Sequence, residues 1–209
     1  MNKTQQVKDG FDKYAVLYRD RHMEEILYND TFDIFCDTLK KQTPYVLELG
    51  CGPGNISKYL LRKRPDFKLL GIDLSVNMVE LAKTHNPTAE FKVMDCREIS
   101  SINESYDGIM CGFCLPYISK EEALHLINDS SKLLNSGGVI YISTMEDDYS
   151  KSDWKNSSDG KHQMFIHYHQ EDYLVEALTK NGFHIVECRH QNYPTDGTQI
   201  VDLIIIAQK

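Results

Sequence analysis

The chain has 209 residues, of which 31 are acidic and 23 are basic, so its formal net charge at pH 7 is −8. A surface that follows nucleic-acid phosphates needs clustered Lys and Arg, and the short basic run at Leu61–Pro65 is more simply the last turn of a helix. No apolar run reaches the length of a membrane span, and the N-terminal residues lack the apolar segment of a secretory signal, so we expect a cytoplasmic protein with neither a nucleic-acid nor a membrane partner.

The first 43 residues are predicted to form a helical cap in two segments. Apolar residues recur at spacings of three and four within residues 11–21 and again within residues 22–42. Tyr14 and Tyr18 lie four residues apart and therefore share one face of the first helix. That face is expected to pack either against the core or against a ligand.

From Tyr45 onward, short apolar runs alternate with helical stretches. The pattern predicts strands near residues 45–50, 67–73, 90–94, 106–112 and 138–144. Helices are predicted near residues 54–64, 75–85 and 120–135, with a short one near 98–103. Because parallel strands need long crossover connections, residues 44–209 are predicted to form a doubly wound, mostly parallel α/β sheet with helices on both faces.

The end of the chain follows a different pattern. A helix is predicted to stop at Asn181-Gly182, followed by a strand near residues 183–190 and a last strand in "IVDLIIIAQK". The connection "QNYPTDGTQ" has turn residues and no room for a helix, so these two strands are predicted to be antiparallel. The polar insert at about residues 145–168 is longer than most connections and is predicted to form a lid.

Three glycines at alternate positions, Gly50, Gly52 and Gly54, follow the first predicted strand in "VLELGCGPGN". One glycine would satisfy a tight turn, whereas three together suggest that a ligand approaches the backbone closely. The dinucleotide fingerprint G-x-G-x-x-G would need its third glycine at Asn55, so the spacing argues against an NAD-dependent oxidoreductase.

Acidic residues stand at the ends of two predicted strands and within a third. Asp73 ends the second strand, where a carboxylate can accept hydrogen bonds from ribose hydroxyls, and Ser75 is available to cap the next helix in its place. Asp95 ends the third strand. Glu48 lies within the otherwise apolar first strand, where its burial requires a partner, either a ligand ammonium group or a donor of the protein.

Five stretches in this order, "VLELGCGPGN", "GIDLS", "VMDCREI", "YDGIMCGF" and "LLNSGGVIYIST", resemble the motifs of class I S-adenosylmethionine-dependent methyltransferases. The resemblance runs from about Tyr45 to the end of the chain. It implies a seven-stranded sheet with an antiparallel last strand, S-adenosylmethionine as the cofactor, and an N-terminal helix that closes over it.

The resemblance also implies roles for single residues. It suggests that Glu48 holds the cofactor amino group, directly or through water, that Asp73 takes the ribose hydroxyls, and that Asp95 faces the adenine amino group. The full set that it places at the cofactor is Tyr14, Tyr18, Glu48, Gly50, Cys51, Gly52, Gly54, Asp73, Leu74, Met78, Asp95, Cys96 and Cys111.

The methyl acceptor is expected to be a small molecule. The resembling enzymes that methylate exocyclic amines carry an Asn or Asp with two prolines after the fourth strand, and this chain has "CGFCLPYIS" there. Phe113, Leu115 and Tyr117 in that loop either line the acceptor pocket or pack in the core. The alternatives are a module that binds S-adenosylmethionine without turnover and, less favoured, an NAD-dependent oxidoreductase.

No catalytic residue is assigned by the sequence. His167 and His169 share one face of an extended segment, and either would be a general base only if it points inward. A metal site would need a third ligand such as Asp147 or Asp148, and none is expected.

The six cysteines are dispersed, which suits a reducing compartment. The "CGFC" spacing at Cys111–Cys114 is that of a redox motif, but it ends a strand rather than beginning a helix. Cys51, Cys96 and Cys111 each end a predicted strand, so we expect them to ring the cofactor pocket and to be protected from thiol reagents by bound cofactor.

Overall fold

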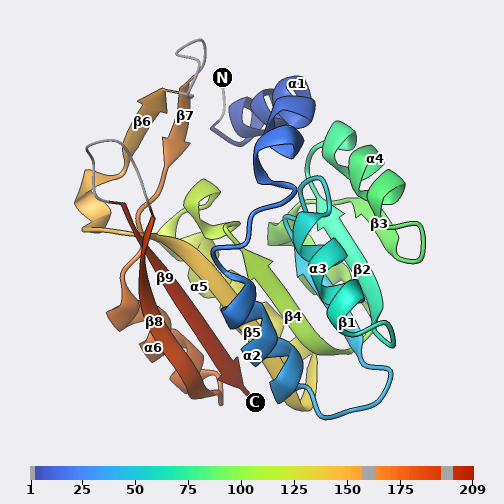
Figure 1. Ribbon diagram of the computed structural model, residues 1–209. Coiled ribbons are helices and arrows are strands. Elements are labelled where there is room, and N and C mark those ends of the chain that lie inside the picture. Colours follow the sequence, from blue (N-terminus) through green and yellow to red (C-terminus); the bar gives the residue numbers. More distant parts are fainter. Residues whose placement is uncertain (1–2, 157–162, 194–199) are drawn as a thin grey trace.

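The computed structural model describes residues 3–156, 163–193 and 200–209. Within them lies a seven-stranded sheet of order β3-β2-β1-β4-β5-β9-β8 and a separate two-stranded sheet, β6-β7 (Figure 1). The strands are β1 Tyr45–Leu49, β2 Lys68–Asp73, β3 Glu90–Val93, β4 Tyr106–Gly112, β5 Leu134–Glu146, β6 Asp153–Asn156, β7 Gln163–Ile166, β8 His184–Tyr193 and β9 Ile200–Gln208. The helices are α1 Lys3–His22, α2 Asn29–Thr38, α3 Asn55–Lys63, α4 Val76–His85, α5 Lys120–Leu133 and α6 Glu171–Lys180, and short 3-10 turns are η1 Cys96–Ser101, η2 Leu115–Tyr117 and η3 Tyr149–Lys151.

The predicted sheet is confirmed, including its antiparallel end. Strands β1 to β5 pair in parallel, and β9 lies between β5 and β8, antiparallel to both. The predicted strand near residues 138–144 is longer in the structure, because β5 pairs with β9 as far as Glu146. The carboxyl ends of the parallel strands and the start of β9 therefore meet at one edge of the sheet.

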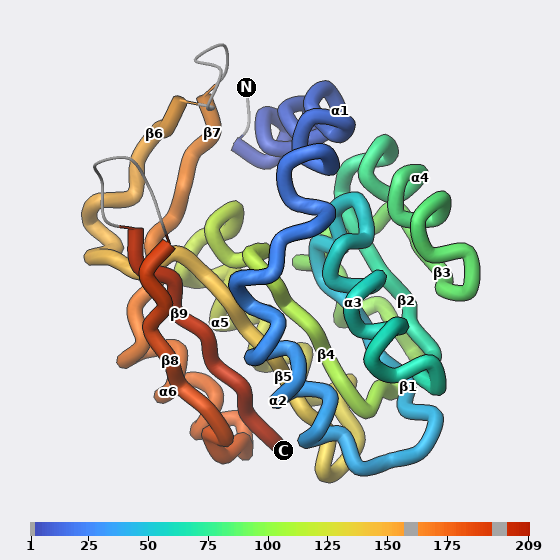
Figure 2. Tube along the Cα trace, viewed as in Figure 1, coloured from blue at the N-terminus to red at the C-terminus, as the bar shows by residue number. Residues whose placement is uncertain are grey.

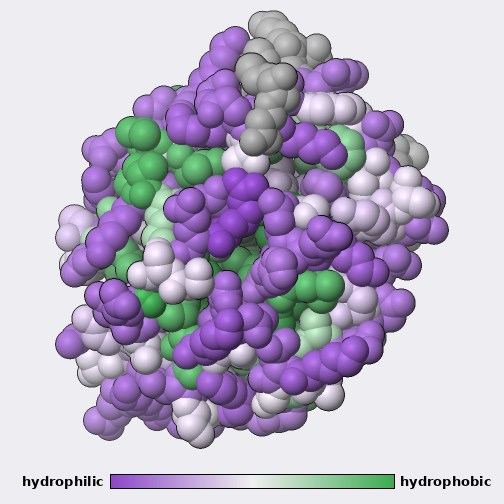
Figure 3. Space-filling view, turned by 180° about the vertical axis from the view of Figure 1, so that it is seen from behind, coloured by the Kyte–Doolittle hydropathy of each residue, from purple (hydrophilic) through white to green (hydrophobic). Residues whose placement is uncertain are grey.

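Helices cover both faces of the sheet and enclose two apolar cores. One core joins α2, α3 and α4 to the sheet and contains the fully buried Phe35 and Leu60. The other joins η1, α5 and α6 to the opposite face and contains Ile99 and Leu174. The face seen from behind is covered mainly by hydrophilic side chains, with smaller apolar areas between them (Figure 3).

The two N-terminal helices have different positions. Helix α2 lies against the sheet, whereas α1 lies over the edge where the parallel strands end (Figures 1 and 2). The predicted first segment, residues 11–21, is too short, since α1 begins at Lys3, and the second helix is confined to Asn29–Thr38. Helix α1 is also kinked, because Tyr14 has the non-helical dihedral angles φ −108° and ψ 15°.

The polar insert contains regular structure. After β5 ends at Glu146, the chain forms η3 and then the antiparallel pair β6–β7, with Trp154 opposite Phe165; residues 157–162 of the insert lie outside the described part. This hairpin lies beside α1, and Lys3 Nζ stands 3.2 Å from the centroid of the Phe165 ring. Every described helix is too short or too polar to cross a lipid bilayer.

Candidate functional site

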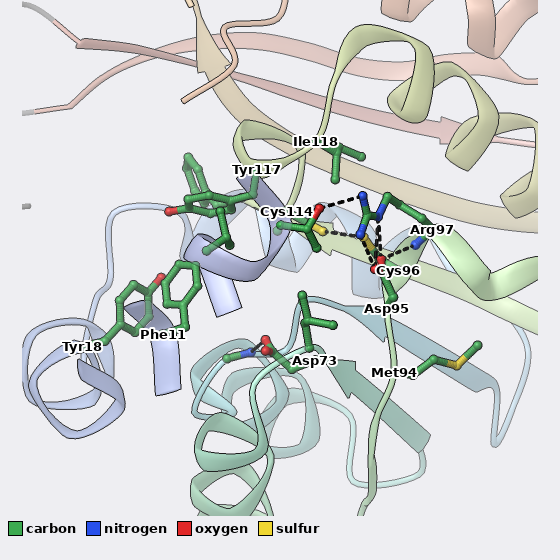
Figure 4. A pocket seen from close by; sticks show the side chains of 17 residues that line it. Phe11, Tyr18, Asp73, Met94, Asp95, Cys96, Arg97, Cys114, Tyr117 and Ile118 are labelled. Atoms are coloured by element: carbon green, nitrogen blue, oxygen red, sulfur yellow. Dashed lines mark hydrogen bonds and ion pairs between the residues drawn. The ribbon is translucent and has the colours of Figure 1, made fainter. Parts of the chain in front are cut away.

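A pocket opens where the parallel strands end, between α1, the loops after β1, β2 and β3, and the loop after β4 (Figure 4). Nine of the residues predicted for the site line it: Tyr18, Gly50, Gly52, Asp73, Leu74, Asp95, Cys96, Phe113 and Tyr117. The other lining residues are Thr4, Val7, Phe11, Met94, Arg97, Gly112, Cys114 and Ile118. Segments separated by about a hundred residues of sequence are thus brought to one edge of the sheet.

The glycine loop needs its glycines for two different reasons. Gly50 and Gly52 have φ values of +65° and +50°, a region that side chains rarely adopt, and both line the pocket. A Cβ atom on Gly52 would stand 3.9 Å from the Tyr18 ring across the pocket. Gly54 does not line the pocket; a Cβ there would come within 2.4 Å of Asn86 Nδ2, so Gly54 is required by the packing of α3 against α4.

Asp73 is held at the end of β2 by backbone donors on either side. Its Oδ2 accepts a hydrogen bond of 2.9 Å from Gly52 N–H, and its Oδ1 accepts one of 2.8 Å from Ser75 N–H. As the sequence suggested, Ser75 caps α4, since its hydroxyl accepts from Met78 N–H at 3.1 Å. A carboxylate offers about four lone-pair positions, so Asp73 retains capacity for two further donors. Burial raises the pKa of Asp73.

Asp95 is engaged by Arg97. The guanidinium Nε lies 2.9 Å from Asp95 Oδ1, and the backbone N–H of Arg97 donates to the same oxygen at 3.0 Å. Burial alone would raise the pKa of Asp95, but the hydrogen bonds from Arg97 outweigh it and lower that pKa. Asp95 thus reaches the pocket as an ion pair rather than as a free carboxylate.

Glu48 lies beneath the pocket and does not line it. It is 1% exposed, and its Oε2 accepts a hydrogen bond from the Ser57 hydroxyl. The structure thus supplies a protein donor to one of the two carboxylate oxygens of Glu48. Burial raises the pKa of Glu48 to about 8. Met78, Cys51 and Cys111 are likewise buried and outside the lining.

Phe113 stands at the corner of the pocket in a strained conformation. Its φ of +52° is uncommon for a bulky residue, and its N–H donates to both the carbonyl and the hydroxyl oxygen of Ser143, each at 3.1 Å. The Phe113 ring lies 5.0 Å from the ring of Tyr28, whose hydroxyl donates to Asp202. The Tyr28 ring therefore lies between Phe113, which lines the pocket, and the buried carboxylate of Asp202 on β9. The largely apolar sequence of β9 did not predict this arrangement.

Three further predicted residues lie outside the lining. Tyr14 does not line the pocket, although it is four residues from Tyr18, because the helix is distorted at Tyr14 itself. The His169 ring is buried between the Tyr173 hydroxyl and the Leu115 carbonyl, and burial lowers its pKa to about 4. His167 lies 3.2 Å from the Tyr149 hydroxyl and is also outside the lining.

Neither histidine therefore faces the pocket as a base would. Among the described residues, no group of three His, Cys, Asp or Glu side chains could hold a metal ion.

Two thiols meet at the pocket wall. Cys96 Sγ and Cys114 Sγ are 3.4 Å apart, and both residues line the pocket. The side chains predicted to ring the pocket were those of Cys51, Cys96 and Cys111; the structure places Cys96 there with Cys114 instead of the other two. Where a strand continues into a loop, the conformation of the turn decides which side chains face the pocket. The position of a residue in the sequence does not give that conformation.

The pocket residues missed by sequence reasoning lie mostly next to predicted ones. Arg97 follows Asp95 by two positions, and Cys114 and Ile118 flank the predicted loop residues. Val7, Phe11 and Tyr18 lie on one face of α1, with spacings of four and seven residues. This apolar spacing was a usable signal, although α1 was predicted to begin only at Phe11.

A family model described as "Methyltransferase domain" matches residues 46–138, from β1 into β5. A protein of Invertebrate iridescent virus 6 is 37% identical over 98 residues, which are 46% of this chain and 36% of that protein. An uncharacterized methyltransferase of Bacillus thuringiensis is 29% identical over 199 residues, which cover 88% of this chain and 92% of that one.

The solved structure of the 1,6-didemethyltoxoflavin-N1-methyltransferase of Burkholderia thailandensis, with bound 1,6-didemethyltoxoflavin and S-adenosylhomocysteine, has a similar fold. It has a TM-score of 0.73 and 20% identity, with 98% of this chain and 88% of that chain covered.

Proposed function

Because this chain belongs by its fold to the class I S-adenosylmethionine-dependent methyltransferases, we propose that it transfers a methyl group from S-adenosylmethionine to a small-molecule acceptor. The observation that carries the proposal is the pocket edge formed by Gly50, Gly52 and Asp73, where backbone without side chains lies beside a carboxylate with spare acceptor capacity.

The charges at the pocket suit a cofactor without phosphate groups. Arg97 is the single cation among the described lining residues, and its guanidinium is already paired with Asp95 and Glu122. A dinucleotide would bring a pyrophosphate that needs free donors or a cation, whereas S-adenosylmethionine carries ribose hydroxyls, an ammonium group and a sulfonium. Asp73 is suited to hold the hydroxyls, and Leu74 and Met94 offer apolar contact to the base.

S-adenosylmethionine supplies a methyl group that its sulfonium already activates. The protein then has to align an acceptor with that methyl group and exclude water, and positioning of this kind can contribute about 7–11 kcal/mol. Phe11, Phe113 and Tyr117 give the pocket an aromatic wall, which suits a site that has to exclude water. The enzyme of similar fold from Burkholderia thailandensis, a 1,6-didemethyltoxoflavin-N1-methyltransferase, has 1,6-didemethyltoxoflavin bound, which supports a small-molecule acceptor here.

Isothermal titration calorimetry with S-adenosylmethionine, S-adenosylhomocysteine and NAD tests the cofactor. S-adenosylmethionine and S-adenosylhomocysteine are expected to bind, and NAD is not. Absence of binding heat with both S-adenosylmethionine and S-adenosylhomocysteine would overturn the proposal. Mass-spectrometric detection of S-adenosylhomocysteine, formed from S-adenosylmethionine in the presence of a set of small phenols, amines, thiols and carboxylic acids, then separates an enzyme from a module that only binds the cofactor.

A further inference from the structure

The guanidinium of Arg97 joins three separate parts of the chain beside the pocket. Its Nε bonds Asp95 after β3, and its Nη1 lies 2.8 Å from Glu122 Oε1 in the first turn of α5. The same Nη1 lies 3.0 Å from Thr4 Oγ1, near the start of α1. Figure 4 shows Arg97 and Asp95 on the opposite side of the pocket from Tyr18.

Two of these partners are fixed by hydrogen bonds that do not involve the Arg97 side chain. Glu122 belongs to a capping box, in which its carboxylate accepts from Ser119 N–H at 2.7 Å while the Ser119 hydroxyl accepts from Glu122 N–H. Asp95 caps η1 through the backbone N–H of Arg97. Thr4 is the partner that belongs to a more weakly held element, so Arg97 connects a rigid base to α1.

Helix α1 buries few apolar side chains of its own. Val7 and Ala15 are its buried residues in the described part, while Val16 and Leu17 are 55% and 46% exposed. Helices of a soluble protein are held mainly by packing of an apolar face, so the position of α1 depends strongly on its polar contacts. One lies near its start, at Thr4.

A second polar contact lies near the middle of α1. Asp12 Oδ1 accepts a hydrogen bond of 2.6 Å from the Ser75 hydroxyl, and the Asp12 carbonyl accepts one of 2.7 Å from Asn77 Nδ2. Besides the contact of Lys3 with the Phe165 ring, helix α1 is therefore held at Thr4 by Arg97 and at Asp12 by the start of α4. Between and beyond these points it presents Val7, Phe11 and Tyr18 to the pocket.

We propose that Arg97 is a positioning residue that couples the docking of α1 to occupation of the pocket, an inference that rests on the proposed function. With α1 docked through Thr4, the wall formed by Val7, Phe11 and Tyr18 closes on the ligand. Coupling between two equilibria is reciprocal, so a bound cofactor strengthens the docking of α1 by the same factor by which docked α1 strengthens cofactor binding.

The test measures S-adenosylhomocysteine affinity by calorimetry and amide hydrogen exchange of residues 3–13, in wild type, Arg97→Gln, Thr4→Val and the double variant. Arg97→Gln is expected to lower the affinity about tenfold, the loss of one charge-assisted hydrogen bond. Thr4→Val is expected to lower it severalfold, and the double variant no further than Arg97→Gln alone. Exchange in α1 should accelerate in each variant.

Arg62→Gln, at an exposed position on α3, is the matched control and should leave affinity and exchange unchanged. Thermal unfolding of each protein shows whether the fold is intact, and Thr4→Val provides a test that leaves both ion pairs of Arg97 in place. The coupling would be overturned if Arg97→Gln lost affinity without faster amide exchange in α1. It would also be overturned if Thr4→Val kept the S-adenosylhomocysteine affinity and the amide exchange of wild type. Failure of the wild type to bind S-adenosylhomocysteine would instead overturn the proposed function.

Discussion

The Tyr28 hydroxyl donates a hydrogen bond of 2.7 Å to Asp202 Oδ2, joining the start of α2 to the last strand. Asp202 is 1% exposed and lies in an otherwise apolar strand, so its charged form is costly. Burial raises the pKa of Asp202 to about 6, although the bond from Tyr28 opposes the shift.

This pair predicts a stability that decreases as the pH rises from about 4 to about 6. In that window the folded protein keeps a proton on Asp202 that the unfolded chain has lost, so the free energy of unfolding falls with pH, by up to about 3 kcal/mol for a shift of this size. Asp202→Asn, which has no proton to lose, should be more stable than wild type at pH 7 and gain nothing at pH 4.

Urea unfolding at several pH values measures this difference. Tyr28→Phe serves as the second variant, because loss of its hydroxyl should raise the pKa of Asp202 further and move the decrease in stability to higher pH. An Asp202→Asn protein whose stability follows the same pH curve as wild type would show that folding does not shift the pKa of Asp202.

Gly52→Ala is predicted to abolish or strongly weaken cofactor binding. An alanine at φ +50° costs about 1–2 kcal/mol in backbone strain, and its methyl group would project toward the Tyr18 ring across the pocket. Gly137→Ala is the matched control, since Gly137 has φ +76° with open space around it. Both variants should lose similar stability in thermal unfolding, and only Gly52→Ala should lose S-adenosylhomocysteine affinity; equal affinities would place the ligand away from the loop.

Tyr18→Ala should weaken S-adenosylhomocysteine binding more than it weakens the fold. Tyr18 lines the pocket and packs edge-on to Phe11 at 5.7 Å, and an aromatic contact is worth about 1 kcal/mol, or about fivefold in affinity. Tyr14→Ala, in the same helix but outside the lining, is expected to bind normally. Calorimetry measures the S-adenosylhomocysteine affinity of the two variants, and thermal unfolding measures their stability. If both variants lost affinity and stability to the same extent, the tyrosines would act only by stabilising the helix.

Bound S-adenosylhomocysteine should slow the reaction of Cys96 and Cys114 with N-ethylmaleimide, because both thiols line the pocket. Cys188 is exposed on β8, far from the lining, and provides the internal control, with the same rate in both conditions. Peptide mass spectrometry after timed labelling follows each thiol separately. Unchanged rates at Cys96 and Cys114, with binding shown independently, would mean that the ligand lies elsewhere.

The sequence determined the order along the chain of the seven strands of the main sheet and of the helices between them, the antiparallel last strand and the glycine loop, because periodicity and turn residues are local properties of the chain. It did not predict the β6–β7 pair inside the polar insert. The sequence also located Asp73 and Asp95, since the ends of parallel strands necessarily meet at one edge of the sheet. Only the tertiary structure decided which partners the side chains in and just after these strands meet. Glu48 turned to Ser57, Asp95 to Arg97, and Cys114 rather than Cys111 reached the pocket. The pairings of Thr4 with Arg97 and of Tyr28 with Asp202 depend on how distant elements pack, and side-chain direction in loops and at kinks has no period from which it could be predicted.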